Sequence, residues 1–178
     1  MRLILLNGPP GSGKSTLARR FADEHPLTLN LDVDRVRDLL GGWRDDRTAA
    51  GVLARGIALA AARTHLAAGH DVVVPQFLGR LPFVLDLAAV AEAAGAPFVE
   101  VALMDSRDAA VRRFAERTRT SADPAHREAG RGVSAAEAGE MYDRLLTVIA
   151  ARPGTRIVPS VEGDVDGTYR ALLATLAR

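Results

Sequence analysis

Short runs of consecutive apolar residues alternate with longer stretches of helical periodicity along the whole chain. An uninterrupted apolar run is typical of a strand buried on both faces, whereas apolar residues three and four positions apart indicate a helix. The apolar runs predict strands at residues 2–7, 27–31, 71–74, 97–103 and 156–158. The stretches between them predict helices at residues 16–24, 33–40, 48–68, 82–94, 105–119, 134–151 and 165–176. This alternation predicts an α/β fold, in which helices cover both faces of a five-stranded parallel sheet.

The 178 residues fit one domain with a sizeable core, and no linker, repeat or low-complexity stretch divides them. We therefore expect a single domain over residues 1–178. Residues 120–133 form the one predicted loop that is long enough to act as a separate element. Together with the end of the preceding helix, this loop is a candidate helical and loop lid at about residues 112–133.

The composition narrows the chemistry that the chain can perform. The chain has no cysteine, which excludes disulfides, thiolate catalysis and cysteine-ligated zinc. Its four histidines show no metal-ligand spacing, and its net charge of +1 indicates no general attraction to nucleic acid or membranes. The apolar run at the N-terminus is too short for the core of a signal peptide, and no run approaches the roughly 20 apolar residues of a membrane span. We expect a cytoplasmic protein without a membrane partner.

Eight consecutive residues between the first predicted strand and helix match the phosphate-binding pattern G-x-x-x-x-G-K-[ST]. They are Gly8, Pro9, Pro10, Gly11, Ser12, Gly13, Lys14 and Ser15. Glycines let backbone N–H groups turn inward around phosphate oxygens, and the helix that follows adds the positive end of its dipole. Lys14 would reach the β- and γ-phosphates, and the Ser15 hydroxyl would bind Mg²⁺. The motif predicts a P-loop NTPase, with Thr16 extending its nucleotide-binding residues.

Two carboxylates follow the second predicted strand, Asp32 and Asp34. Ligands of open parallel sheets bind at the carboxyl ends of the strands. A carboxylate there could orient an acceptor hydroxyl and take its proton while the γ-phosphate is transferred. Either aspartate could instead cap the helix that begins beside it. The sequence leaves both interpretations open for each residue.

The phosphate loop, together with the segment L-D-V-D-R-V-R-D-L-L, resembles the small P-loop kinase superfamily. This superfamily includes shikimate kinase, gluconate kinase, chloramphenicol phosphotransferase and polynucleotide 5′-kinase. The resemblance implies that Asp34 contacts the acceptor hydroxyl and that Asp32 lies near magnesium. Arg37 matches the position where polynucleotide kinases hold a substrate phosphate.

A second segment, R-R-F-A-E-R-T-R at residues 112–119, resembles the R-x-x-x-R that opens the lid of these kinases. The resemblance implies that Arg113 and Arg117 close over ATP, with Arg117 neutralising charge on the transferring group. The two arginines share a helix face, since they are one turn apart. The alternative is a solvated helix surface with Glu116 as their partner. Residues 160–168 are similar to the adenine-contacting loop of gluconate kinases.

The chain also departs from this superfamily. After the third strand these kinases often place an acidic or hydroxyl residue near magnesium, whereas this chain has Gln76, which supplies no charge. The D-G-[FY]-P-R signature of nucleoside monophosphate kinases is absent, and so is the N-K-x-D signature of GTPases. We therefore expect ATP as the phosphoryl donor, with Mg²⁺ bound by Ser15 and Asp32.

The acceptor pocket is expected at about residues 34–66. Trp43, Arg44 and Arg80 are further candidates for contact with the acceptor, although a lone tryptophan is also typical of a packing residue. The predicted function is an ATP-dependent transfer of phosphate to a hydroxyl of a small molecule. Two alternatives stay open: a polynucleotide 5′-hydroxyl kinase, because arginines are frequent after Asp34, and a nucleotide-binding regulatory module with slow hydrolysis. Acidic residues among those arginines weaken the first alternative.

Overall fold

The apolar runs of the sequence form β-strands, and those at residues 3–7 and 72–75 are buried at every position, as is typical of central strands in a parallel sheet. A computed structural model describes residues 1–120 and 132–177. In these residues five strands make one sheet in the order β2-β3-β1-β4-β5. The strands are β1 (Leu3–Asn7), β2 (Leu29–Asn30), β3 (Val72–Pro75), β4 (Phe98–Met104) and β5 (Arg156–Pro159). The pairs β1–β3, β2–β3 and β4–β5 are parallel, so the predicted α/β fold with a five-stranded parallel sheet is confirmed.

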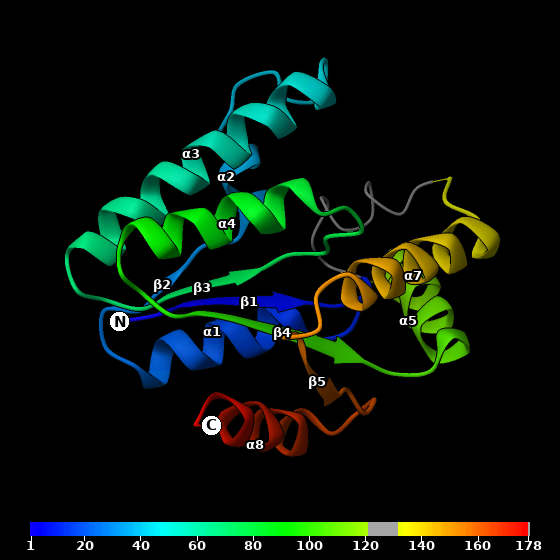
Figure 1. Cartoon of the computed structure of the whole chain (residues 1–178). Coiled ribbons are helices and arrows are strands. Elements are labelled where there is room, and N and C mark those ends of the chain that lie inside the picture. The colour runs from blue at the N-terminus through cyan, green and yellow to red at the C-terminus, as the bar shows by residue number, and fades with distance from the viewer. Residues whose placement is uncertain (121–131, 178) are drawn as a thin grey trace. The chain divides into compact units, whose positions relative to one another are not determined.

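The chain divides into two compact units, and the first comprises Met1–Leu6, Ser15–Gln76 and Leu81–Glu100. Its helices are α1 (Lys14–Glu24), α2 (Val33–Asp38), α3 (Arg47–Ala67) and α4 (Pro82–Ala93), of which α1 contributes all but its first residue. Figure 1 shows α1 on one side of strands β1 and β3 and the helices α3 and α4 on the other. Helices therefore cover both faces of the sheet in this unit.

Small side chains explain how α3 packs in the first unit. Its buried positions recur every four residues and are Ala50, Ala54, Ala58, Ala62 and Leu66. A stripe of alanines on one face lets a helix lie close to its neighbours, and α3 contacts α2, α4 and β3. The helix begins at the N-cap Asp46, whose side chain accepts a hydrogen bond from the Ala49 N–H.

The second unit comprises Asn7–Lys14, Phe77–Arg80 and Val101–Arg178. Its described helices are α5 (Arg107–Thr120), α7 (Ala135–Ala150) and α8 (Val165–Leu176). Helix α5 packs on α7, and α8 packs on β5. A capping box between Ser134 and Glu137 defines the start of α7. None of the helices in the described ranges is long and apolar enough to span a membrane.

The second strand is the element whose predicted bounds differ most from the structure. The pattern predicts a strand at 27–31, but β2 covers Leu29–Asn30 alone. Leu27 has a φ of 62°, in the left-handed region, and the Thr28 N–H donates to the His25 carbonyl. These residues therefore form a turn rather than a strand, because a left-handed residue cannot continue an extended chain.

Candidate active site

The phosphate loop connects the end of β1 to the start of α1. Its lysine is folded back onto the loop: the Lys14 ammonium donates to the carbonyls of Gly8 and Pro9, both at 2.9 Å. Lys14 is 9% exposed. Carbonyl oxygens can hold an ammonium until a phosphate replaces them, because both present negative charge to it. The loop therefore holds a cation ready for an anionic ligand.

Two glycines in the loop are required for different reasons. A Cβ at Gly8 would lie 2.7 Å from the Leu103 carbonyl oxygen and 2.7 Å from the Ser12 hydroxyl, so a side chain has no room there. A Cβ at Gly13 would meet nothing within 4 Å, but its φ of 85° is a conformation that other residues rarely adopt. Gly8 thus lets the loop pack on β4, and Gly13 lets it turn beside open space.

Asn7 fixes the place where the loop leaves β1. Its side-chain oxygen accepts from the N–H groups of Gly8, at 2.8 Å, and Leu78, at 2.9 Å. Its side-chain nitrogen donates to the Leu78 carbonyl at 3.1 Å. The residue is buried, and these three bonds all run to backbone groups. Sequence reasoning missed this anchor, although a polar asparagine at the end of an apolar run and directly before the motif was a usable signal.

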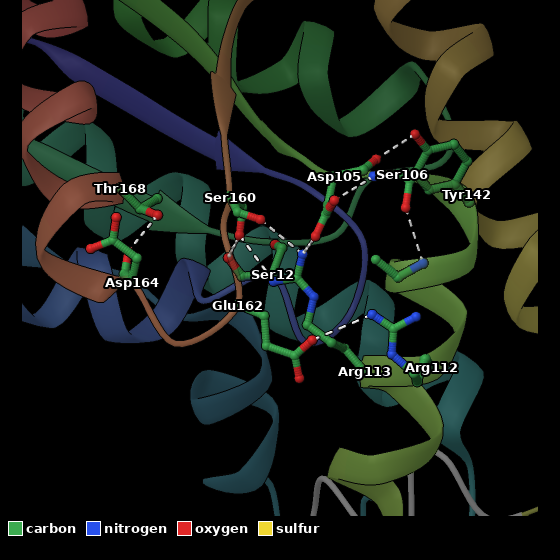
Figure 2. A network of polar contacts seen from close by, with 11 residues as sticks. Ser12, Asp105, Ser106, Arg112, Arg113, Tyr142, Ser160, Glu162, Asp164 and Thr168 are labelled. Atoms are coloured by element: carbon green, nitrogen blue, oxygen red, sulfur yellow. Dashed lines mark hydrogen bonds and ion pairs between the residues drawn. The ribbon is translucent and has the colours of Figure 1, made fainter.

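A set of four residues that we call the phosphate-loop network consists of Ser12, which contributes its backbone carbonyl from the loop, and of Asp105, Arg113 and Ser160 (Figure 2). The Arg113 guanidinium, from α5, donates to the Asp105 carboxylate, to the Ser160 hydroxyl at 3.2 Å and to the Ser160 carbonyl at 2.9 Å. The Ser160 hydroxyl donates in turn to the Ser12 carbonyl at 3.0 Å. The predicted ATP-binding Arg113 therefore contacts acceptor groups of the chain itself.

Asp32 combines the two roles that the sequence leaves open. It is the N-cap of α2, where its carboxylate accepts from the Asp34 N–H at 3.0 Å, and it accepts from the Ser15 hydroxyl at 3.4 Å. Burial raises the pKa of Asp32, and the charge of Asp34 raises it further. The structure thus brings the two predicted magnesium ligands together.

Ser15 and Asp32 present hydroxyl and carboxylate oxygens, which are the ligands that Mg²⁺ prefers. Gln76 follows β3, the neighbour of β2, and its side-chain oxygen is buried without a hydrogen-bond partner in the described part of the chain. An amide oxygen of this kind also suits Mg²⁺ or its water ligands. No group of three or more His, Cys, Asp or Glu in the described residues could hold a metal. The donor set therefore fits a magnesium ion whose remaining ligands are phosphate oxygens and water.

Three predicted acceptor residues of the first unit, Arg37, Trp43 and Arg44, form together with Arg47 a set that we call the arginine–tryptophan cluster. The guanidinium carbons of Arg37, Arg44 and Arg47 lie 4.4, 4.5 and 5.9 Å from the centre of the Trp43 ring. Trp43 is 7% exposed, so its side chain is part of the packed interior and also presents its ring to the arginine cations. Arg37 also forms an ion pair with Asp34 at 3.0 Å. The structure therefore brings Asp34 into contact with this cluster.

The other predicted residues lie at varied positions. Thr16 and Arg80 are exposed, and Arg117 is half-buried on α5. A cavity of about 390 Å³ runs along α1 and is lined by Ser15, Thr16, Arg19, Arg20 and Asp23. Half of the predicted lid, residues 121–131, lies outside the described residues. The roles assigned to these residues stay predictions.

Comparison with known proteins identifies the family. A search of curated proteins finds no match to the sequence. A gluconokinase structure from Sinorhizobium meliloti 1021 is 21% identical with a TM-score of 0.64, and the alignment covers 99% of this chain and 92% of that one. A candidate kinase from Chloroflexus aurantiacus j-10-fl is 16% identical with a TM-score of 0.69, covering 99% and 96%. At these identities the likeness shows a shared fold. A family model described as an AAA domain matches residues 3–136, so the chain belongs to this AAA domain family.

Proposed function

We propose that the protein is an ATP-dependent kinase that transfers the γ-phosphate to a hydroxyl of a small molecule. The observation that carries the proposal is the phosphate loop, in which the buried Lys14 ammonium donates to the carbonyl oxygens of Gly8 and Pro9. Ser15 follows it directly and contacts Asp32. The kinase-like fold and family support the same reaction class.

In the proposed reaction, the acceptor oxygen forms a bond to the γ-phosphorus while the bond to the β–γ bridging oxygen breaks. ADP leaves with that electron pair, and the proton of the acceptor hydroxyl passes to Asp34. Backbone N–H groups of the loop and the Lys14 ammonium stabilise the charge on the phosphate oxygens. Mg²⁺, held by Ser15 and Asp32, would supply further positive charge to the β- and γ-phosphates. Arg117 is proposed to contact the transferring group.

The acceptor side of the proposal rests on Asp34 and the cluster beside it. The Asp34 side chain is 55% exposed, so a substrate hydroxyl can reach its carboxylate. Its ion pair with Arg37 restricts the orientation of that carboxylate, so that the carboxylate can take a proton from a hydroxyl bound in one position. We assign the acceptor to the region of residues 34–66, with Arg80 as an additional contact.

The test is a screen of metabolites, antibiotics and 5′-hydroxyl oligonucleotides for acceptor-stimulated release of ADP. We expect at least one small molecule to stimulate release above the rate with water alone. Asp34→Asn should lower the stimulated rate about 10²–10⁴-fold, the usual contribution of a general base, and leave ATP affinity unchanged. Asp38→Asn, on the same short helix, is the matched control and should keep most of the rate.

Three outcomes would contradict this proposal. Stimulation by oligonucleotides alone would make the protein a polynucleotide kinase, and no stimulation by any acceptor would leave a nucleotide-binding module with slow hydrolysis. An Asp34→Asn variant with full stimulated activity would remove Asp34 from the mechanism.

A further inference from the structure

The Ser160 hydroxyl lies between two groups whose hydrogen-bonding roles are fixed. The Arg113 guanidinium on one side can only donate, and the Ser12 carbonyl on the other side can only accept. The hydroxyl therefore accepts from Arg113 and directs its own proton to the Ser12 oxygen. The buried contact from α5 thus determines the direction of a bond to the phosphate loop.

The Ser12 carbonyl and the Gly13 N–H belong to one planar, trans peptide group, so they point in opposite directions. A bond that holds the carbonyl toward Ser160 therefore holds the Gly13 N–H away from it. The side of Gly13 on which a Cβ would stand is open, with no atom within 4 Å. Inward N–H groups of such a loop bind phosphate oxygens. Glycine conformations interconvert easily, so this peptide needs an external contact to keep one orientation.

Ser160 and Asp105, the two partners of Arg113, are themselves held by further hydrogen bonds within the second unit. Ser160 follows β5, and its N–H donates to the Met104 carbonyl at 2.7 Å. The Asp105 carboxylate accepts from the Ser106 N–H at 2.7 Å, and the Asp105 carbonyl accepts from the Tyr142 hydroxyl at 2.7 Å. The Arg113 side chain is 10% exposed, which shields its bonds from competition with water. Figure 2 shows Arg113 in contact with Asp105 and Ser160, and Tyr142 in contact with Asp105.

We propose that Arg113 is a positioning residue, which acts through Ser160 to hold the Ser12–Gly13 peptide in its phosphate-binding orientation. This inference rests on the proposed function, since it concerns how the loop binds a nucleotide. It differs from the role that the sequence implies, in which Arg113 closes over ATP. If Arg113 contacted the γ-phosphate, its loss would lower the affinity for ATP alone. If Arg113 orients the loop, its loss lowers the affinity for every nucleotide whose phosphates the loop binds.

The experiment compares full-length Ser160→Ala, Ser160→Thr, Arg113→Ala and wild type by two measurements. Calorimetry gives the Kd of ATP and of ADP. Relaxation-dispersion NMR of the nucleotide-free protein detects whether the Ser12–Gly13 peptide exchanges between two orientations on the microsecond to millisecond timescale. Arg107→Ala is the control, because Arg107 also lies on α5 and binds a carboxylate, Asp143, at 3.0 and 3.1 Å, but is exposed.

We expect Ser160→Ala and Arg113→Ala to weaken the binding of ATP and of ADP by the same factor, about tenfold. Both variants should also show conformational exchange in the NMR signals of Ser12 and Gly13. Ser160→Thr restores the hydroxyl and should restore both measurements, and Arg107→Ala should match wild type. Arg113→Ala leaves Asp105 without its guanidinium partner, which could prevent folding. In that case Ser160→Ala still tests the proposal.

A loss of ATP affinity at least tenfold greater than the loss of ADP affinity in Arg113→Ala would overturn the proposal and make Arg113 a ligand of the γ-phosphate. An unchanged Ser12–Gly13 signal in Ser160→Ala would overturn it as well. If the wild-type protein binds neither nucleotide, the proposed function fails, while the NMR measurement still decides whether Ser160 holds the peptide.

Discussion

The phosphate-loop network and the arginine–tryptophan cluster both use arginine, but they hold it by different forces. In the network, hydrogen bonds to a carboxylate, a hydroxyl and a carbonyl determine one position for a guanidinium that is 10% exposed. In the cluster, three guanidinium groups lie near one aromatic ring, a contact that tolerates several positions of the cation, and Arg37 is in addition ion-paired with Asp34. Hydrogen bonds are strongly directional, whereas cation–ring contacts are less so.

This difference fits the two halves of the proposed reaction. A phosphate group has the same shape in every nucleoside triphosphate, so a rigid loop can be complementary to it in advance. An acceptor pocket must fit one particular molecule, and adaptable contacts can be changed there without disturbing the donor site. We therefore expect substitutions near the loop to affect nucleotide binding and substitutions near the cluster to affect the acceptor.

Lys14→Ala should give the largest effect on the loop side. It removes the cation that we assign to the β- and γ-phosphates, so kcat/KM should fall about 10²–10³-fold and ATP binding should weaken. The measurement is acceptor-stimulated ADP release together with calorimetry. Arg170→Ala removes an exposed cation from α8 and is the control. If Lys14→Ala kept full activity, the loop would not be the donor site.

Trp43→Ala should give the largest effect on the cluster side. Truncating this buried ring should lower the free energy of unfolding by about 3 kcal/mol, as is usual for a buried aromatic residue. Urea denaturation followed by circular dichroism measures the change. Trp43→Phe keeps an aromatic face for the arginines and should lose much less. Equal losses of unfolding free energy in the two variants would contradict this expectation, because a buried ring with a face for the arginines would then not stabilise the fold.

Asp32→Asn tests the magnesium assignment. Asparagine caps a helix about as well as aspartate, so stability should change little, while loss of the carboxylate charge should raise the Mg²⁺ requirement about tenfold. A magnesium titration of ADP release measures this shift. A half-saturating Mg²⁺ concentration equal to that of wild type would leave Asp32 as a helix cap alone.

Ser134→Ala should give the smallest effect. Loss of this N-cap should lower the free energy of unfolding by about 1 kcal/mol and leave nucleotide affinity unchanged. Hydrogen bonds from the Ser134 N–H and hydroxyl hold the pKa of Glu137 below its ordinary value of 4.5. The stabilisation from Glu137 is therefore present above that value and is lost as the pH falls through the lowered pKa.

The difference in stability between wild type and Ser134→Ala should accordingly narrow in acid. Urea denaturation over a pH series measures it. A difference that stayed constant down to the lowest pH would contradict the contribution of Glu137. A change in ATP affinity would show that the start of α7 influences the phosphate-loop network.

Most of the fold could be predicted because apolar periodicity is a local property. The helix predicted at 165–176 has the bounds of α8, and the other elements agree to within two residues at each end, although β2 keeps only two of the five residues predicted for it. There the strand shortens because Leu27 adopts a left-handed conformation, which the apolar pattern does not encode. The phosphate loop was predictable for the same local reason, since its residues are contiguous.

The phosphate-loop network could not be predicted, because its partners are far apart in the sequence. Ser12 and Ser160 are separated by 148 positions, and Arg113 and Ser160 by 47. Only the folded chain brings them into contact, and neither Ser160 nor Asp105 belongs to the phosphate-binding motif. Sequence reasoning found Arg113 through its resemblance to lid arginines, which indicates a ligand contact and not the internal contacts that the structure shows.

The burial of Trp43 has a practical consequence for finding the acceptor. It is the chain's one tryptophan, so indole fluorescence comes from a single position beside Arg37 and Arg44. Indole emission is sensitive to nearby charges, and an acceptor that displaced either guanidinium would shift or quench it. The unlabelled protein therefore carries its own optical probe for screening compounds, and this probe responds to binding before any phosphate is transferred.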